Sequence, residues 1–130
     1  AIREVAFESM ESNTQGYSVN RDIAINPAAA FPEKTFFHET GHVMLGHTSP
    51  EAYDEYKRHR GMKELGAEAV AHLVTNELGL LTPQMASVSR AYIQSWSAGE
   101  KPGDSEVRDI FKAVDQIVQA GRPVQAEVSV

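Results

Sequence analysis

Residues 36–47 read FFHETGHVMLGH, a stretch in which apolar residues flank a group of polar ones that includes two histidines and a glutamate. Pro32, shortly before it, suits the first position of a helix, because its fixed φ and its missing N–H cost nothing there. Gly46 suits the end of a helix, since glycine readily adopts the conformation of a C-terminal cap. The pattern therefore predicts one helix from 32 to about 45.

Residues 38–42 of this helix form the pattern His-Glu-x-x-His. His38 and His42 are four residues apart and lie one turn apart on the same face, so both imidazoles can reach one metal ion. Glu39 is offset around the helix, which suits a general base that contacts a water molecule rather than the metal. A buried apolar helix does not carry such a group without partners, and the motif predicts a zinc site. The alternative is two surface or core histidines that fall at this spacing by chance.

A catalytic zinc has three protein ligands, and in a chain without cysteine the third is His, Asp or Glu. We expect Glu68, because small apolar residues surround it in the next long helix and a buried carboxylate needs a cation. Glu64 and Glu77 are the competing carboxylates, but Glu64 precedes the small residues and Glu77 lies near the end of the helix. His47 is five residues after His42 and lies mostly on another face.

The order of elements predicts an α+β fold. Alternating polar and apolar residues predict a small N-terminal antiparallel sheet of about three strands, at residues 4–10, 15–19 and 22–26, with a tight turn at Asn20-Arg21. Start and stop signals then predict about five helices. Their expected ranges are 32–45, 50–61, 62–78, 82–97 and 104–121.

Length and charge limit the functions of this chain. Its 130 residues suit one domain, 1–130, with a loosely held tail at 122–130. The 12 Lys and Arg against 18 Asp and Glu give a net charge of −6, without the basic stripe typical of nucleic-acid modules. The absence of cysteine excludes a disulfide scaffold and a thiolate zinc finger. No apolar run is long enough to cross a membrane.

The run HETGHVMLGH, with Glu68 downstream, resembles the ImmA/IrrE-type zinc metallopeptidases, which take a glutamate from the following helix as third ligand. About residues 15–120 are still more similar to the metallopeptidase domain of ArdC-type antirestriction proteins. The shared features are a tyrosine-containing hairpin with an Asn-Pro exit and several short motifs in the same order. They comprise Tyr17, Asn26-Pro27, Lys34-Thr35, Glu77-Leu78-Gly79, Ala91-Tyr92-Ile93 with Trp96, and Ile110-Phe111-Lys112-Ala113.

The resemblance implies a minimal zincin-like metallopeptidase that hydrolyses a peptide bond in a protein substrate, such as a repressor or a host defence factor. Zn²⁺ would be held by His38, His42 and Glu68, with Glu39 activating the water. The implied location is the cytoplasm, without direct contact of this domain with nucleic acid or membrane. The alternative is a zincin-shaped antirestriction or binding module that acts by occupying a partner.

Two further residues are candidates for catalysis, because peptide hydrolysis needs a donor for the developing oxyanion. Tyr92 lies in the Ala-Tyr-Ile-x-x-Trp segment, and His72 lies one turn after Glu68. The alternative for Tyr92 is an aromatic pair with Trp96 on a core-facing helix. For His72, the alternatives are a core histidine or a hydrogen-bond donor to a metal ligand.

Overall fold

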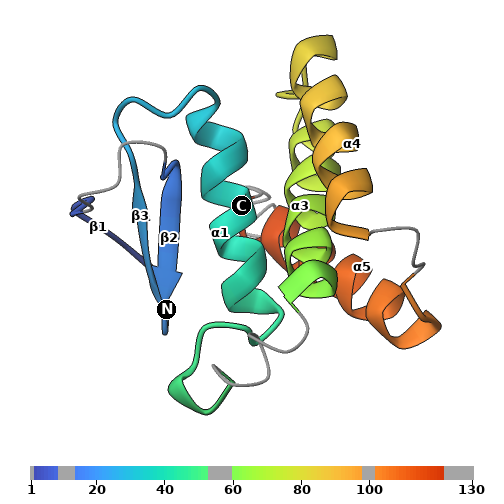
Figure 1. Ribbon diagram of the computed structural model, residues 1–130, viewed down its shortest axis with the longest axis horizontal. Coiled ribbons are helices and arrows are strands. Elements are labelled where there is room, and N and C mark those ends of the chain that lie inside the picture. Colours follow the sequence, from blue (N-terminus) through green and yellow to red (C-terminus); the bar gives the residue numbers. More distant parts are fainter. Residues whose placement is uncertain (1, 9–13, 53–59, 98–101, 122–130) are drawn as a thin grey trace, which may run out of the picture.

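The computed structural model describes residues 2–8, 14–52, 60–97 and 102–121. The expected C-terminal tail, 122–130, lies outside the described residues. The architecture is α+β, with a three-stranded sheet followed by helices (Figure 1). In the part of the chain that is described, no helix combines the length and the apolarity needed to cross a membrane.

The sheet consists of β1 (Arg3–Val5), β2 (Gly16–Val19) and β3 (Asp22–Ile25), in the order β1-β3-β2. β2 and β3 form the expected antiparallel hairpin, and Asn20 in its turn has a φ of 53°. Asparagine is one of the few residues that tolerates this left-handed conformation. Because β3 is central, β2 is an edge strand.

The expectation of a purely antiparallel sheet is wrong, because β1 pairs with β3 in parallel. The end of β1 and the start of β2 lie at the same end of the sheet on opposite sides of β3, so β1 runs antiparallel to β2 and therefore parallel to β3. The guanidinium of Arg3 holds the carboxylate of Asp22 through two hydrogen bonds of 2.9 and 3.0 Å across this parallel pair.

The predicted number of five helices is also wrong. The described residues contain four α-helices: α1 (Pro32–Met44), α3 (Arg60–Glu77), α4 (Pro83–Ser97) and α5 (Asp104–Gly121). The start signal at Pro50 produces only a 3₁₀ turn, η1 (Pro50–Ala52), and residues 53–59 lie outside the described part. Gly61, expected as a stop, lies in the first turn of α3, where backbone N–H groups lack intrahelical partners in any case.

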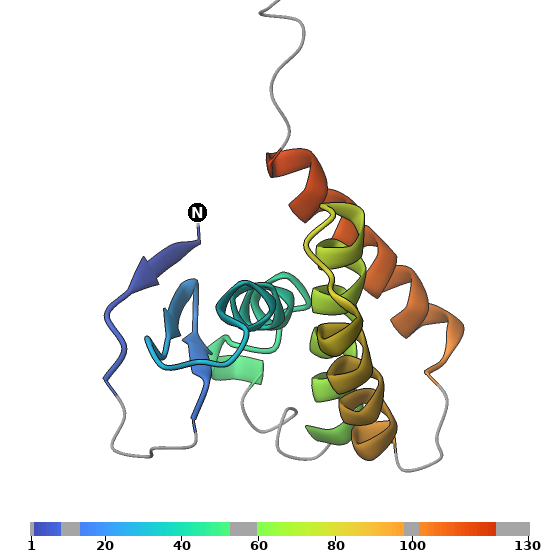
Figure 2. The same cartoon turned by 90° about the horizontal axis from the view of Figure 1, so that it is seen from above.

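The molecule is layered, with α1 between the sheet on one side and α3 on the other (Figure 2). α4 and α5 both pack against α3. The main apolar cluster joins α3 and α5, with partly buried residues of α1 packed against it. Its buried members are Val70, Val74, Ile110, Ala113 and Val118.

Gly41 allows α1 to lie very close to α3. A Cβ atom at this position would lie 3.1 Å from Cβ of Val70 and 3.2 Å from the backbone oxygen of Ala67. Such distances are tighter than normal packing, so a larger residue would separate the two helices. The glycine inside the His-Glu-x-x-His motif thus brings the histidine face of α1 next to α3.

Candidate metal centre

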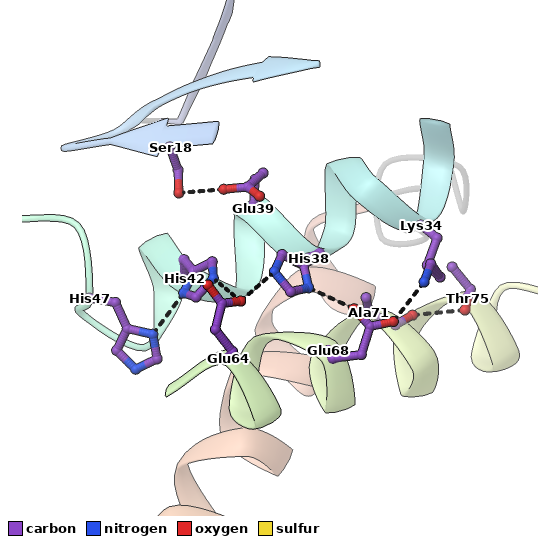
Figure 3. Close-up of polar contacts among 10 residues, drawn as sticks. All are labelled: Ser18, Lys34, His38, Glu39, His42, His47, Glu64, Glu68, Ala71 and Thr75. Atoms are coloured by element: carbon purple, nitrogen blue, oxygen red, sulfur yellow. Dashed lines mark hydrogen bonds and ion pairs between the residues drawn. The ribbon is translucent and has the colours of Figure 1, made fainter. Parts of the chain in front are cut away.

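α1 and α3 run antiparallel and exchange polar contacts at intervals of one helical turn (Figures 1 and 3). α1 contributes Lys34, His38 and His42, and α3 contributes Glu64 and Glu68. Each series has a spacing of four residues, which keeps its members on one face of a helix. All five side chains are at most 12% exposed, so the polar ladder lies inside the helix interface.

The two motif histidines meet at a single carboxylate oxygen. Oε2 of Glu64 lies 3.0 Å from Nε2 of His38 and 3.1 Å from Nε2 of His42. These three residues form a group whose ligand atoms lie within 4.8 Å of one another. In the described part of the chain, this is the one group of three or more His, Asp or Glu residues that could hold a metal ion.

Glu68, expected as the third ligand, lies on the opposite side of the His38 ring. Its Oε2 atom is 2.7 Å from Nδ1 of His38, and its Oε1 atom accepts a hydrogen bond of 2.8 Å from Nζ of Lys34. The structure therefore brings Glu64, and not Glu68, to the point where both Nε2 atoms converge. Glu68 is one turn further along α3, beyond His38, so the carboxylate reaches the other nitrogen of that ring.

These outer contacts would fix the tautomers of the two histidines once a metal takes the place of the Nε2 protons. An ionised carboxylate only accepts hydrogen bonds, so Nδ1 of His38 would keep its proton and donate to Glu68. Nδ1 of His42 lies 2.9 Å from Nδ1 of His47. With a metal bound at Nε2 of His42, Nδ1 of this ring would likewise keep its proton and donate to His47.

Burial and charge act in opposite directions on the pKa values of this cluster. Burial disfavours the charged form of His38, but its hydrogen bonds to Glu64 and Glu68 outweigh this and raise its pKa to about 10. For Glu68, burial raises the pKa of the carboxyl group, but the contacts with His38 and Lys34 outweigh this and hold the pKa below its usual value. Burial and the neighbouring His42 lower the pKa of His47 to about 3, so this imidazole stays neutral and can accept a hydrogen bond from Nδ1 of His42.

The donor set fits zinc. Two imidazole nitrogens and one carboxylate oxygen are a common protein ligand set of catalytic zinc sites. Tetrahedral coordination with zinc–ligand distances of about 2.0–2.2 Å places two ligand atoms about 3.3 Å apart. The separations of 3.0 and 3.1 Å around Glu64 are close to that value. The two contacts of Glu64 therefore match the spacing of zinc ligands, and all three ligand atoms lie within 4.8 Å of one another.

Glu39 lies on another face of α1, directed toward the sheet (Figure 3). It is 8% exposed, and its Oε1 atom accepts a hydrogen bond of 2.7 Å from Oγ of Ser18 on β2. Glu39 and Glu64 line two cavities, one of which is also lined by His38 and the other by His42; together they form the cleft of the site. Residues of β2 line these cavities opposite the histidines and glutamates of α1 and α3.

Tyr92 lines one of these cavities together with His38, and the two rings are perpendicular with centroids 6.3 Å apart. Tyr92 is 44% exposed, and Nζ of Lys34 lies 5.9 Å from the centre of its ring. Its place at the cleft is compatible with a role in catalysis, which stays a prediction.

His72 lies outside the cleft. It is eight residues after Glu64, which is about 12 Å along α3, and it lines neither of the two cavities. Its Nδ1 atom is buried without a hydrogen-bond partner among the described residues, and burial lowers its pKa. The structure thus favours Tyr92 over His72 as a group that can reach a substrate.

Three features of the site were missed by sequence reasoning: the convergence on Glu64, the contact of His47 with His42, and the contact of Ser18 with Glu39. Only the first had a usable signal, since Glu64 and Glu68 share a face of one helix. Comparison of the chain with protein-family models, curated proteins and solved structures finds no match.

Proposed function

We propose that this chain is a zinc-dependent endopeptidase domain that hydrolyses a peptide bond in a protein substrate. The observation that carries the proposal is the convergence of two Nε2 atoms on one oxygen of Glu64, next to a separately held glutamate in the same motif. A purely structural cluster would have no need for Glu39 on the cleft side. The donor set supports zinc as the cofactor.

His38, His42 and Glu64 would hold the ion, and Glu64 also lines the two cavities that Glu39 borders. Zinc bound there would lower the pKa of water and polarise the carbonyl group of the substrate. Glu39 would take the proton of the attacking water and return it to the leaving amine as general acid. Its Oε1 atom is held by Ser18, which leaves Oε2 for this proton transfer.

The edge strand β2 would bind the substrate as an additional, extended strand. β2 forms one edge of the sheet and lines the cleft with Gly16 and Ser18. Beyond Val19 this edge is covered, because the N–H of Asn20 donates to the backbone oxygen of Thr48 at 2.9 Å. An extended peptide would therefore pair with Gly16–Val19 and cross the face that carries Glu39.

The test combines metal analysis with cleavage of fluorescently labelled casein by zinc-loaded protein. The wild-type chain should contain one zinc and cleave, whereas Glu39→Gln should keep the zinc and lose roughly a hundredfold or more of the cleavage rate. Glu33→Gln is the matched control, because Glu33 lies on the exposed first turn of the same helix. Equal cleavage by Glu39→Gln and the wild type would contradict the proposal, as would metal-replete protein without zinc.

A further inference from the structure

The close approach of β2 to α1 depends on Gly16. A Cβ atom at this position would lie 2.9 Å from Cγ2 of Thr35 and 2.9 Å from the backbone oxygen of Ala24. Both distances are shorter than atoms in folded proteins tolerate, so glycine lets the strand lie against the helix here. The contact between Gly16 and Thr35 sets the register of β2 on α1.

The same register places Ser18 opposite Glu39. β2 and α1 run in the same direction (Figure 1). Two residues along a strand span about 6.6 Å, and four residues along a helix span about 6 Å. One step of this size from the Gly16–Thr35 contact therefore leads to Ser18 on the strand and Glu39 on the helix.

The alternation of side chains along β2 is consistent with this register. Tyr17, between the two positions, faces away from α1: its ring packs 5.5 Å from that of Phe7, and its hydroxyl accepts a hydrogen bond of 3.0 Å from the N–H of Glu8. Ser18 donates to Glu39 at 2.7 Å. Across the described residues, this is the one hydrogen bond recorded for the Glu39 carboxylate.

We propose that Ser18 is a positioning residue, which holds one carboxylate oxygen of Glu39 so that the other is directed to the substrate-binding cleft. A buried carboxylate on a three-torsion side chain has several rotamers, and a charge-assisted hydrogen bond selects one of them. Because Ser18 belongs to the strand that would bind the peptide, substrate and base are held by the same element. This inference rests on the proposed function.

The experiment compares zinc-loaded wild type, Ser18→Ala and Ser18→Thr. Two readouts are measured: kcat and KM with labelled casein, and the affinity for acetohydroxamic acid, a probe that would give its hydroxyl proton to Glu39 and bind as acetohydroxamate. Ser18→Ala should lower kcat and weaken acetohydroxamate binding roughly tenfold, the loss typical of a hydrogen bond to a charged group. Zinc affinity and KM should change by less than about twofold, because Ser18 contacts none of the three proposed ligand side chains, and the protein should still unfold in one cooperative transition.

Ser18→Thr should restore most of the effect, since it keeps the hydroxyl and suits a strand. Ser87→Ala is the control, because it makes the same change on the exposed surface of α4. Wild-type kcat and acetohydroxamate affinity in Ser18→Ala would overturn the inference alone. So would a loss that Ser18→Thr does not restore. A wild-type protein that binds no zinc would overturn both this inference and the proposed function.

Discussion

Replacing Glu64 by glutamine tests which carboxylate completes the metal site. The change keeps the volume of the side chain and removes its charge. One oxygen of Glu64 faces both Nε2 atoms, at 3.0 and 3.1 Å, whereas Glu68 contacts only the Nδ1 side of His38, at 2.7 Å. In the proposed site, Glu64→Gln would therefore replace a charged direct ligand by a weak neutral one, whereas Glu68→Gln would remove the charge of a group that orients a ligand.

The geometry leads to different magnitudes for the two variants. Zinc binding free energies of about 12 kcal/mol, spread over three protein ligands, correspond to about 4 kcal/mol for each. Loss of this amount weakens the zinc affinity by about a thousandfold. Loss of an orienting contact weakens it by about tenfold to a hundredfold. Glu64→Gln should therefore have the larger effect by at least about an order of magnitude.

The assay is competition for zinc with a chromophoric chelator, using wild type, Glu64→Gln and Glu68→Gln at one pH. Glu77→Gln is the control, because it is the same substitution near the exposed end of α3 and should keep the wild-type affinity. The reasoning is refuted if Glu68→Gln loses zinc while Glu64→Gln retains it, which would return the third ligand to the position expected from the sequence.

Three further outcomes follow from the same geometry. Zinc should raise the melting temperature, because its ligands join α1 to α3 and the ion binds the folded state; identical melts of verified holo and apo protein would argue against a bridging site. Gly41→Ala should destabilise the fold by about 1–3 kcal/mol in denaturant unfolding and weaken zinc binding, since a Cβ atom would meet Val70 at 3.1 Å; unchanged unfolding would mean that the helices can separate freely. Tyr92→Phe should lower casein cleavage about a hundredfold with the zinc content unchanged, as expected for an oxyanion donor; full activity would assign Tyr92 a packing role only.

Local signals in the sequence were sufficient for much of the secondary structure. The first helix begins at Pro32 as expected, and the hairpin turns at Asn20. The number of helices and the direction of β1 were wrong, for reasons that local patterns do not contain. Pro50 marks a start but does not determine how far the helix continues. Strand direction depends on the path of the connecting chain, which alternation does not encode.

The sequence by itself determined the histidine face of the site, because four residues on a helix always return to the same side. It could not determine which glutamate meets that face. Glu64 and Glu68 occupy equivalent places on α3, one turn apart, and the choice depends on how far α3 is shifted along α1. That shift is set by packing at Gly41, where α1 approaches Ala67 and Val70. In the same way, the contact between Ser18 and Glu39 depends on Gly16 lying against Thr35. Only the tertiary structure decides such pairs, because spacing along one chain fixes directions within an element but not the offset between two elements.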